Sequence, residues 1–212
     1  VRIAAVMISV VVFVAISGCA TIRTSSHAFD NGRVLEAGRT RYTTDSVMFL
    51  WVPVPGQVSV SRGFPGGWEA TAGWGIHGFV PNDESSESED PLNGPELYVA
   101  KELFNVRDTV YMSGTVGIDA NVIPQVDALL QARIVAGFHP TTWFAVFGNA
   151  GVAYVTRSQQ LAPIVGAGFG LDGPVVLKLA AYITPDQTES RTTADILWPF
   201  YYGLQIGWKT GP

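Results

Sequence analysis

The stretch from Thr109 to Phe138 constrains the fold of this chain most strongly, because apolar and polar residues alternate through it with a period of two. The apolar or small residues of its first half are Val110, Met112, Gly114, Val116, Ile118 and Ala120, and those of its second half are Val126, Ala128, Leu130, Ala132, Ile134, Ala136 and Phe138. Successive side chains of a strand point to opposite faces, so each half predicts a strand with one apolar face. Soluble strands average about five or six residues, whereas roughly nine to eleven cross a bilayer at a tilt. Both halves are long enough to cross.

The rest of the chain repeats this pattern between turn-forming segments. Asn121-Val122-Ile123-Pro124 separates the two halves of the first hairpin and predicts a short reversal. Further strands are predicted at residues 33–42, 47–62, 68–80, 96–104, 143–155, 161–171, 175–183 and 198–209. Pro53, Pro55 and Gly56 interrupt the second of these and predict a bulge. The sequence therefore predicts an all-β fold, an antiparallel up-and-down transmembrane β-barrel of about ten strands spanning residues 33–209.

The lengths of the connections agree with this arrangement. The two long polar connections, at residues 81–94 and 184–197, both follow odd-numbered strands, whereas the connections after even-numbered strands are short. The long connections should therefore lie together at one end of the barrel, and the short turns at the other.

Composition narrows the class of protein. Charged residues make up 15% of the chain, where soluble domains carry about 25%, as expected for a barrel with a large surface facing lipid. The net charge of −5 gives no reason to expect nucleic acid as a partner. With one cysteine, the chain cannot form an internal disulfide.

The N-terminal segment carries targeting signals. Ile3 to Ile16 is apolar except for Ser9, which is typical of the hydrophobic region of a signal peptide. Ile16-Ser17-Gly18-Cys19 then resembles the bacterial lipobox, and this resemblance implies a lipoprotein signal peptide over residues 1–18 and acylation of Cys19 by the lipoprotein-processing machinery. Two or three acyl chains make a stable anchor. We expect residues 19–32, which include the lipidated N-terminus, to form a polar tether to the barrel.

The C-terminal strand carries a second resemblance. Tyr201, Gly203, Ile206 and Trp208 are similar to the assembly signal of bacterial outer-membrane β-barrels, with Ile206 standing where an aromatic residue is usual and four residues following Trp208. The resemblance implies insertion into the bacterial outer membrane by the barrel-assembly machinery, with outer-membrane lipid as the principal partner. It also implies that loops 81–94 and 184–197 face the outside of the cell, where they could meet an extracellular ligand.

In such a barrel the polar faces of the strands line the lumen. The candidates for lining it are Glu69, His77, Tyr111, Asp119, Asp127, Gln131, Arg133 and Lys178. The lumen of a narrow barrel is filled mostly by side chains. We therefore expect these charges to pair in structural networks, with a narrow charged pore as the functional alternative.

The sequence gives little sign of catalysis or of a cofactor. His27, His77 and His139 are scattered, and no Ser/His/Asp set can be assembled from the strand assignments. The acidic residues between Asp83 and Asp90 lack the spacing of a calcium-binding EF-hand loop. We expect a non-enzymatic protein without cofactor or metal.

Two functions remain open from the sequence. The first is a lipid-anchored outer-membrane β-barrel with a structural or small-pore role. The alternative is a periplasmic or surface lipoprotein with a soluble, ligand-binding β-barrel of lipocalin type. Both barrels have one apolar face, so the decisive property is whether that face points outward or inward.

Overall fold

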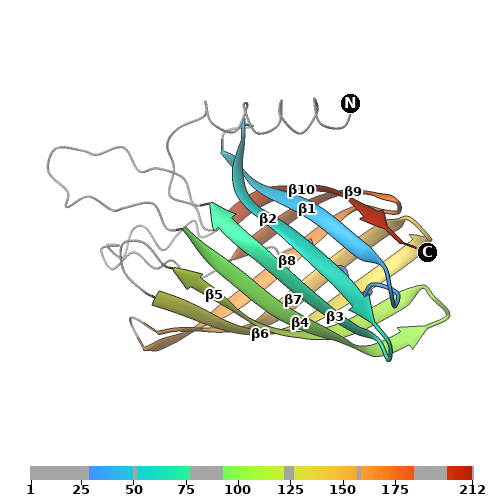
Figure 1. Ribbon diagram of the computed structural model, residues 1–212, viewed down its shortest axis with the longest axis horizontal. Coiled ribbons are helices and arrows are strands. Elements are labelled where there is room, and N and C mark those ends of the chain that lie inside the picture. The colour runs from blue at the N-terminus through green and yellow to red at the C-terminus, as the bar shows by residue number, and fades with distance from the viewer. Residues whose placement is uncertain are drawn as a thin grey trace, which may run out of the picture.

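A computed structural model describes residues 29–49, 52–76, 93–121, 127–156, 159–183 and 200–211. Ten antiparallel strands form one closed barrel, each strand pairing with its neighbours in sequence and β1 pairing with β10 (Figure 1). The strands are β1 (Thr40–Phe49), β2 (Val52–Phe64), β3 (Trp68–Ile76), β4 (Asn93–Val106), β5 (Val110–Asn121), β6 (Asp127–Thr141), β7 (Phe144–Val155), β8 (Gln160–Asp172), β9 (Val175–Ile183) and β10 (Phe200–Thr210). The predicted all-β up-and-down barrel is confirmed. Within the described residues, no helix is long and apolar enough to cross a membrane.

The first two strands differ from their predicted bounds. β1 begins at Thr40, so most of the predicted strand 33–42 precedes the barrel wall, and residues 47–49, predicted for the second strand, belong to β1. The predicted bulge is present, because Asp45 pairs with Gln57 while Ser46 pairs with Pro55, which leaves Gly56 unpaired. A proline cannot donate to the ladder, and a bulge accommodates it.

Tight turns join the strands at one end of the barrel, which we call the short-turn end. They connect β2 to β3, β4 to β5, β6 to β7 and β8 to β9. In the first, Gly66 and Gly67 have φ values of 78° and 71°, a conformation that glycine adopts without steric cost. In the second, Arg107 and Asp108 also have positive φ, and the Thr109 N–H donates to the Val106 carbonyl across them. Loops 81–94 and 184–197 lie outside the described residues, and the strands that flank them define the opposite, long-loop end.

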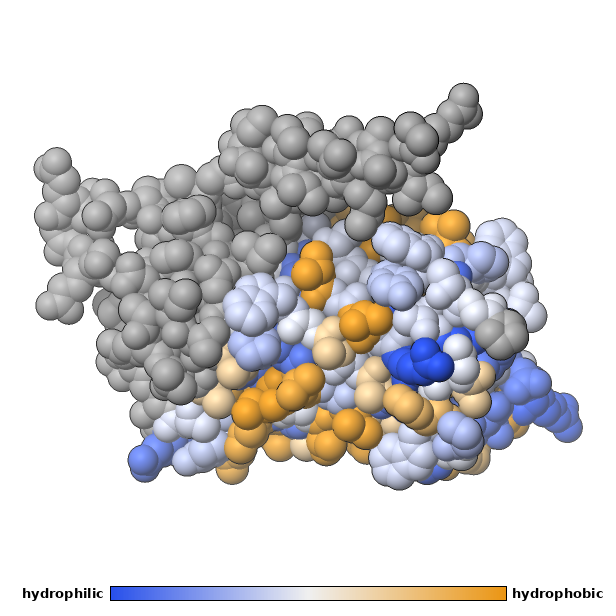
Figure 2. All heavy atoms as spheres, viewed as in Figure 1, coloured by the Kyte–Doolittle hydropathy of each residue, from blue (hydrophilic) through white to orange (hydrophobic). Residues whose placement is uncertain are grey.

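The polarity of the barrel wall is the reverse of that of a water-soluble protein. Polar and charged side chains of the strands are buried inside, among them Arg41, Thr43, Asp45, Gln57, Glu69, Glu96, Ser113, Thr115, Asp119, Gln131, Arg133, Asn149, Lys178 and Gln205. Large apolar side chains are exposed on the outside, among them Val58, Leu97, Val99, Val116, Leu130, Ile134, Val152, Phe169, Leu177 and Ile206. Figure 2 shows the apolar side chains gathered over the barrel wall. The apolar face of the alternation therefore points outward.

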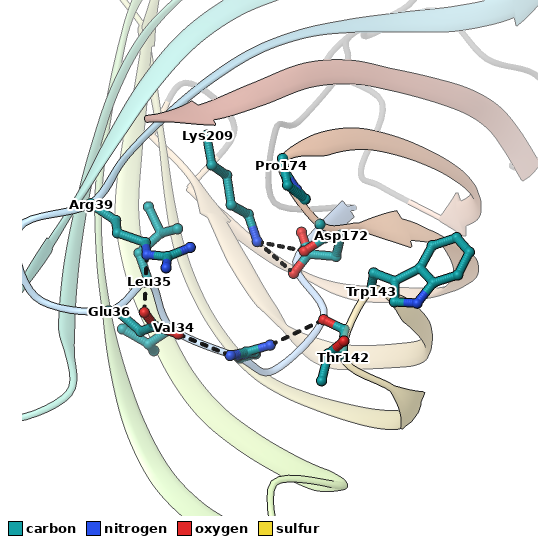
Figure 3. A pocket seen from close by; sticks show the side chains of 11 residues that line it. Val34, Leu35, Glu36, Arg39, Thr142, Trp143, Asp172, Pro174 and Lys209 are labelled. Carbon is teal, nitrogen blue, oxygen red and sulfur yellow. Dashed lines mark hydrogen bonds and ion pairs between the residues drawn. The ribbon is translucent and has the colours of Figure 1, made fainter. Parts of the chain in front are cut away.

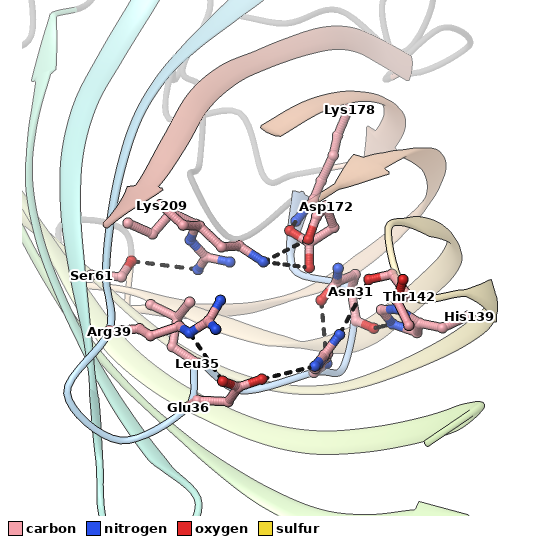
Figure 4. A network of polar contacts seen from close by, with 12 residues as sticks. Asn31, Leu35, Glu36, Arg39, Ser61, His139, Thr142, Asp172, Lys178 and Lys209 are labelled. Carbon is pink, nitrogen blue, oxygen red and sulfur yellow. Dashed lines mark hydrogen bonds and ion pairs between the residues drawn. The ribbon is translucent and has the colours of Figure 1, made fainter. Parts of the chain in front are cut away.

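Residues 29–38 form an interior segment, which we call the plug. They precede β1, and residues 29–35 lie within the barrel, while residues 36–38 are exposed at its mouth (Figure 4). Phe29 is fully buried against Ala145, Phe147 and Ala180 of β7 and β9. Close to β1, Gly38 donates from its backbone N–H to the carbonyl of Gly63 on β2. The barrel is thus filled at its short-turn end by its own N-terminal segment.

Candidate functional site

The interior of the barrel is the candidate functional site, and its first polar network links three adjacent strands. The Tyr98 hydroxyl of β4 donates to Asp119 of β5, and Gln131 of β6 donates to both of them. Arg133 donates in turn to the side-chain oxygen of Gln131. Gly117 of β5 is the cross-strand partner of both Tyr98 and Gln131. A Cβ at this position would collide with the Tyr98 ring. This bare position on β5 lets the tyrosine ring lie flat against the wall.

A second network joins the plug to β1 and β3. The Arg41 guanidinium lies 2.5 Å from one carboxylate oxygen of Glu69, and both side chains are buried. The other oxygen of Glu69 accepts a 2.8 Å hydrogen bond from the backbone N–H of Leu35. Asp30 lies 3.9 Å from Arg41. Glu69 therefore neutralises a buried cation and holds the plug backbone with the same carboxylate.

A third network lies beside the second, where Asp172 of β8 pairs with two lysines, one of which, Lys209 of β10, is the cross-strand partner of Arg41. The ammonium of Lys178 lies 3.2 Å from one carboxylate oxygen, and that of Lys209 lies 3.0 Å from the other (Figure 4). Lys178 is fully buried and also donates to the carbonyl of Phe29 at 3.1 Å. Burial of an isolated charge is costly, so these pairings are what allow the charges to lie inside the barrel.

The plug is also held directly by the barrel wall near the short-turn end. The Asn31 carbonyl lies 3.1 Å from Nε2 of His139, a buried residue near the end of β6. The ring of Tyr111 packs edge-on against His139, with centroids 4.8 Å apart, and the Arg33 guanidinium lies 5.5 Å from the centre of the Tyr111 ring. His139 follows Phe138, the last residue of the predicted strand, whereas in the structure it belongs to β6 and contacts the plug.

A small charged cavity of about 290 Å³ opens at the short-turn end beside the plug (Figure 3). Its charged lining is paired: Glu36 lies 3.1 Å from Arg33 and 3.0 Å from Arg39, and Asp172 lies 3.0 Å from Lys209. Among the described residues, no group of three or more His, Cys, Asp or Glu side chains could hold a metal ion. The charges around this cavity are therefore largely neutralised by one another.

The predicted lumen residues fall into three groups. Glu69, Asp119, Gln131, Arg133 and Lys178 are buried inside the barrel, in the three networks described above. Tyr111 is also buried, but near the short-turn end and against the plug rather than in the middle of the lumen. His77 and the side chain of Asp127 lie outside the described residues.

The structure describes only some of the residues that resemble the lipobox and the barrel-assembly signal. Cys19 and the side chain of Tyr201 lie outside the described residues. Gly203 of β10 faces the plug, since a Cβ there would lie 2.6 Å from the Phe29 ring. Ile206 and Trp208 are exposed on the outer face.

Several interior residues were not among the predicted candidates. Tyr98 lies between the apolar Leu97 and Val99, so a stricter reading of period two would have found it, whereas Arg41 and Asp45 stand in the polar run of residues 40–46 and give no such signal. Asp172 lies one residue beyond the predicted strand 161–171 and next to the turn-forming Gly173 and Pro174, so its place inside the barrel is not expected from the sequence. The burial of residues 29–38 has no signal in the sequence, because their contacts are with strands distant along the chain.

Aromatic side chains form a belt on the outer surface near the short-turn end. The belt consists of Tyr42, Phe64, Trp68, Phe104, Phe138, Trp143 and Trp208, all exposed. Tyr42 stacks on Trp208 with ring centroids 5.4 Å apart, and the Lys101 ammonium lies 5.3 Å from the centre of the Trp68 ring. Aromatic girdles flanked by cations are typical of the boundary between a lipid bilayer and water.

In comparisons with known proteins, no family model and no curated protein matches the chain.

Proposed function

We propose that this chain is a lipid-embedded β-barrel of the bacterial outer membrane, anchored in addition through an acylated Cys19, with a closed lumen and a structural role. The observation that carries the proposal is the inverted polarity of the wall. At mid-strand, Val116 is 58% exposed and Leu97 is 57% exposed, while the neighbouring Thr115 and Glu96 are buried. This distribution suits a barrel surrounded by hydrocarbon.

The same observation argues against the soluble alternative. A lipocalin-type barrel encloses an apolar ligand with its apolar face and shows water its polar face. Monomeric soluble proteins rarely expose contiguous apolar patches larger than a few hundred Å². Here the outward side chains in the middle of the wall are apolar on most strands, with Thr44 and Ser46 of β1 as exceptions, and the interior holds ion pairs such as Arg41–Glu69 and Lys178–Asp172.

The filled interior favours a structural role over a small pore. The plug occupies the short-turn end, and the network of Tyr98, Asp119, Gln131 and Arg133 occupies the side of β4–β6 nearer the long-loop end. Every one of these groups is held by hydrogen bonds or ion pairs to the wall or to the plug. A solute could pass only after several buried charge pairs had been separated, each at a cost of several kcal/mol.

The proposal is tested by gel mobility of the isolated membrane fraction, with and without boiling in SDS. We expect the protein to resist an alkaline wash, and to migrate faster in cold SDS than after boiling because the barrel stays folded. Release by the wash without a mobility shift would refute the membrane-embedded barrel.

The closed lumen is tested separately in planar lipid bilayers. The full-length protein should insert without producing steady single-channel currents. Reproducible channels of uniform conductance would contradict the structural role and favour the small pore, while leaving the membrane-embedded barrel intact.

A further inference from the structure

The outer wall of the barrel carries a hollow centred on β3. Its volume is about 770 Å³, and residues of five neighbouring strands, β1 to β5, line it. Ala70 and Ala72 of β3 lie at its centre, where their short side chains stand between larger ones on the adjacent strands: Val60 on β2, and Leu97 and Val99 on β4. A row of short side chains between taller rows leaves a groove along the strand, open to whatever surrounds the barrel.

This hollow extends from the aromatic belt to the middle of the wall. At the belt it is lined by Arg62, two residues before Phe64 on β2, and by Tyr42 on the adjacent strand. At its other end it reaches Leu97 and Val116, the exposed mid-strand residues of the wall. Because aromatic belts lie at the level of lipid head groups, the hollow connects head-group depth with hydrocarbon depth.

Arg62 is exposed and brings a positive charge to the belt end of the hollow. Its cross-strand partners are the uncharged residues Thr40 on β1 and Ala70 on β3. In the part of the chain that the structure describes, no side chain forms an ion pair or a hydrogen bond with its guanidinium. A charged group on an apolar wall is costly unless another group satisfies it, so Arg62 needs a partner from outside the protein.

A second cation, Lys101, lies on the other side of β3, as the cross-strand partner of Trp68. Its ammonium donates to the Gly66 carbonyl and lies 5.3 Å from the centre of the Trp68 ring, so the protein itself satisfies this charge. No acidic side chain lines the hollow to offset either cation. The electrostatic complement of this part of the wall is therefore an anion at head-group depth.

We propose that the hollow binds one anionic phospholipid from the leaflet that borders the short-turn end. The lipid phosphate binds the Arg62 guanidinium, whose fork of N–H donors matches two phosphate oxygens. One acyl chain lies in the groove over Ala70 and Ala72. This inference rests on the proposed function, since only a barrel embedded in a bilayer presents this wall to lipid.

Native mass spectrometry of the refolded protein tests the phosphate contact. The protein is refolded in vesicles of phosphatidylglycerol and phosphatidylcholine in equal amounts, with identical acyl chains, and is then extracted into mild detergent. The parent protein should retain phosphatidylglycerol in preference to phosphatidylcholine. Arg62→Gln should reduce this preference roughly fivefold, the effect of one basic side chain at an anionic lipid surface. Arg107→Gln removes the same charge from the exposed β4–β5 turn, outside the hollow, and should leave the preference unchanged.

A second pair of variants tests the acyl-chain contact. Ala72→Phe fills the groove, whereas Ala132→Phe adds the same side chain to an exposed position of β6 that does not line the hollow. Both changes place an apolar side chain on the outer face, so both variants should fold, and the mobility shift in cold SDS verifies this. Retention of phosphatidylglycerol should be lost in Ala72→Phe and kept in Ala132→Phe.

Equal retention of the two lipids by the parent protein would overturn the site, and so would equal losses in Arg62→Gln and Arg107→Gln. A dimer without bound lipid that Ala72→Phe dissociates would also overturn it, because the hollow would then be a contact between two copies of the chain. Failure of the proposed function looks different: the parent protein itself would show no mobility shift in cold SDS, and the lipid site would fall with it.

Discussion

Replacing Glu69 with glutamine should destabilise the barrel much more than its single charge suggests. The Glu69 carboxylate faces the buried Arg41 guanidinium at 2.5 Å and accepts the Leu35 N–H at 2.8 Å. Removing one partner of a buried ion pair costs roughly 3–5 kcal/mol, because the other charge stays buried and uncompensated. Asp30 remains 3.9 Å from Arg41, which places the expected loss at the lower end, about 3 kcal/mol.

Glu36→Gln is the matched control, since Glu36 belongs to the plug but its side chain is 55% exposed. Its two ion pairs, with Arg33 and Arg39, are exposed and should together contribute no more than about 1 kcal/mol. The assay is urea-induced unfolding of the protein refolded in phospholipid vesicles, followed by tryptophan fluorescence. Equal losses for the two variants, or a loss below about 1 kcal/mol for Glu69→Gln, would refute the buried pair as the link between plug and wall.

Three further predictions use the same unfolding assay. Gly137→Ala should lower the free energy of unfolding by roughly 1–3 kcal/mol, because the added Cβ would overpack against the plug. Gly148→Ala should be tolerated, because its Cβ would lie 3.6 Å from the nearest atom. Similar losses for both variants would show that the plug does not pack against Gly137. Val116→Lys, at the middle of the outer wall, should lower the free energy of unfolding by roughly 2–4 kcal/mol. Thr210→Lys, at the edge of the wall, should lower it by only about 0–1 kcal/mol. An unchanged stability of the Val116→Lys variant would contradict a hydrocarbon environment. Tyr98→Phe should lower the free energy of unfolding by roughly 1–3 kcal/mol, because Asp119 and Gln131 lose the hydroxyl as a hydrogen-bond partner. An unchanged stability would exclude this network as a source of stability.

The barrel could be predicted from the sequence because its wall obeys a local rule. Residues 109–138 alternate strictly enough to give both strands, the same period predicts the remaining strands, with wrong bounds for the first two, and Pro53, Pro55 and Gly56 predict the bulge. Where the alternation fails, the structure supplies the reason. Leu129 and Val135, apolar residues on the polar face of β6, are buried inside the lumen.

The plug could not be predicted, because its position depends on contacts between residues far apart in sequence. Asn31 meets His139, and Leu35 meets Glu69, across more than thirty residues in each case. The sequence predicts residues 29–32 as part of a polar tether and residues 33–38 as the start of the first strand, so neither prediction places a segment inside the lumen. The carbonyls and N–H groups of the plug can be buried only because the wall presents matching partners, which no local pattern records.

The central claim is that hydrocarbon surrounds the outer wall, and a fluorophore on Val116→Cys tests it most directly. The label is attached in a Cys19→Ser background, with Asp108→Cys in the exposed β4–β5 turn as the control, and the protein is refolded in lipid vesicles. We expect lipids brominated on their acyl chains to quench the label at position 116 while aqueous iodide does not, and the label at position 108 to respond in the opposite way. If iodide quenches the label at position 116 as much as the label at position 108, the outer wall faces water rather than hydrocarbon.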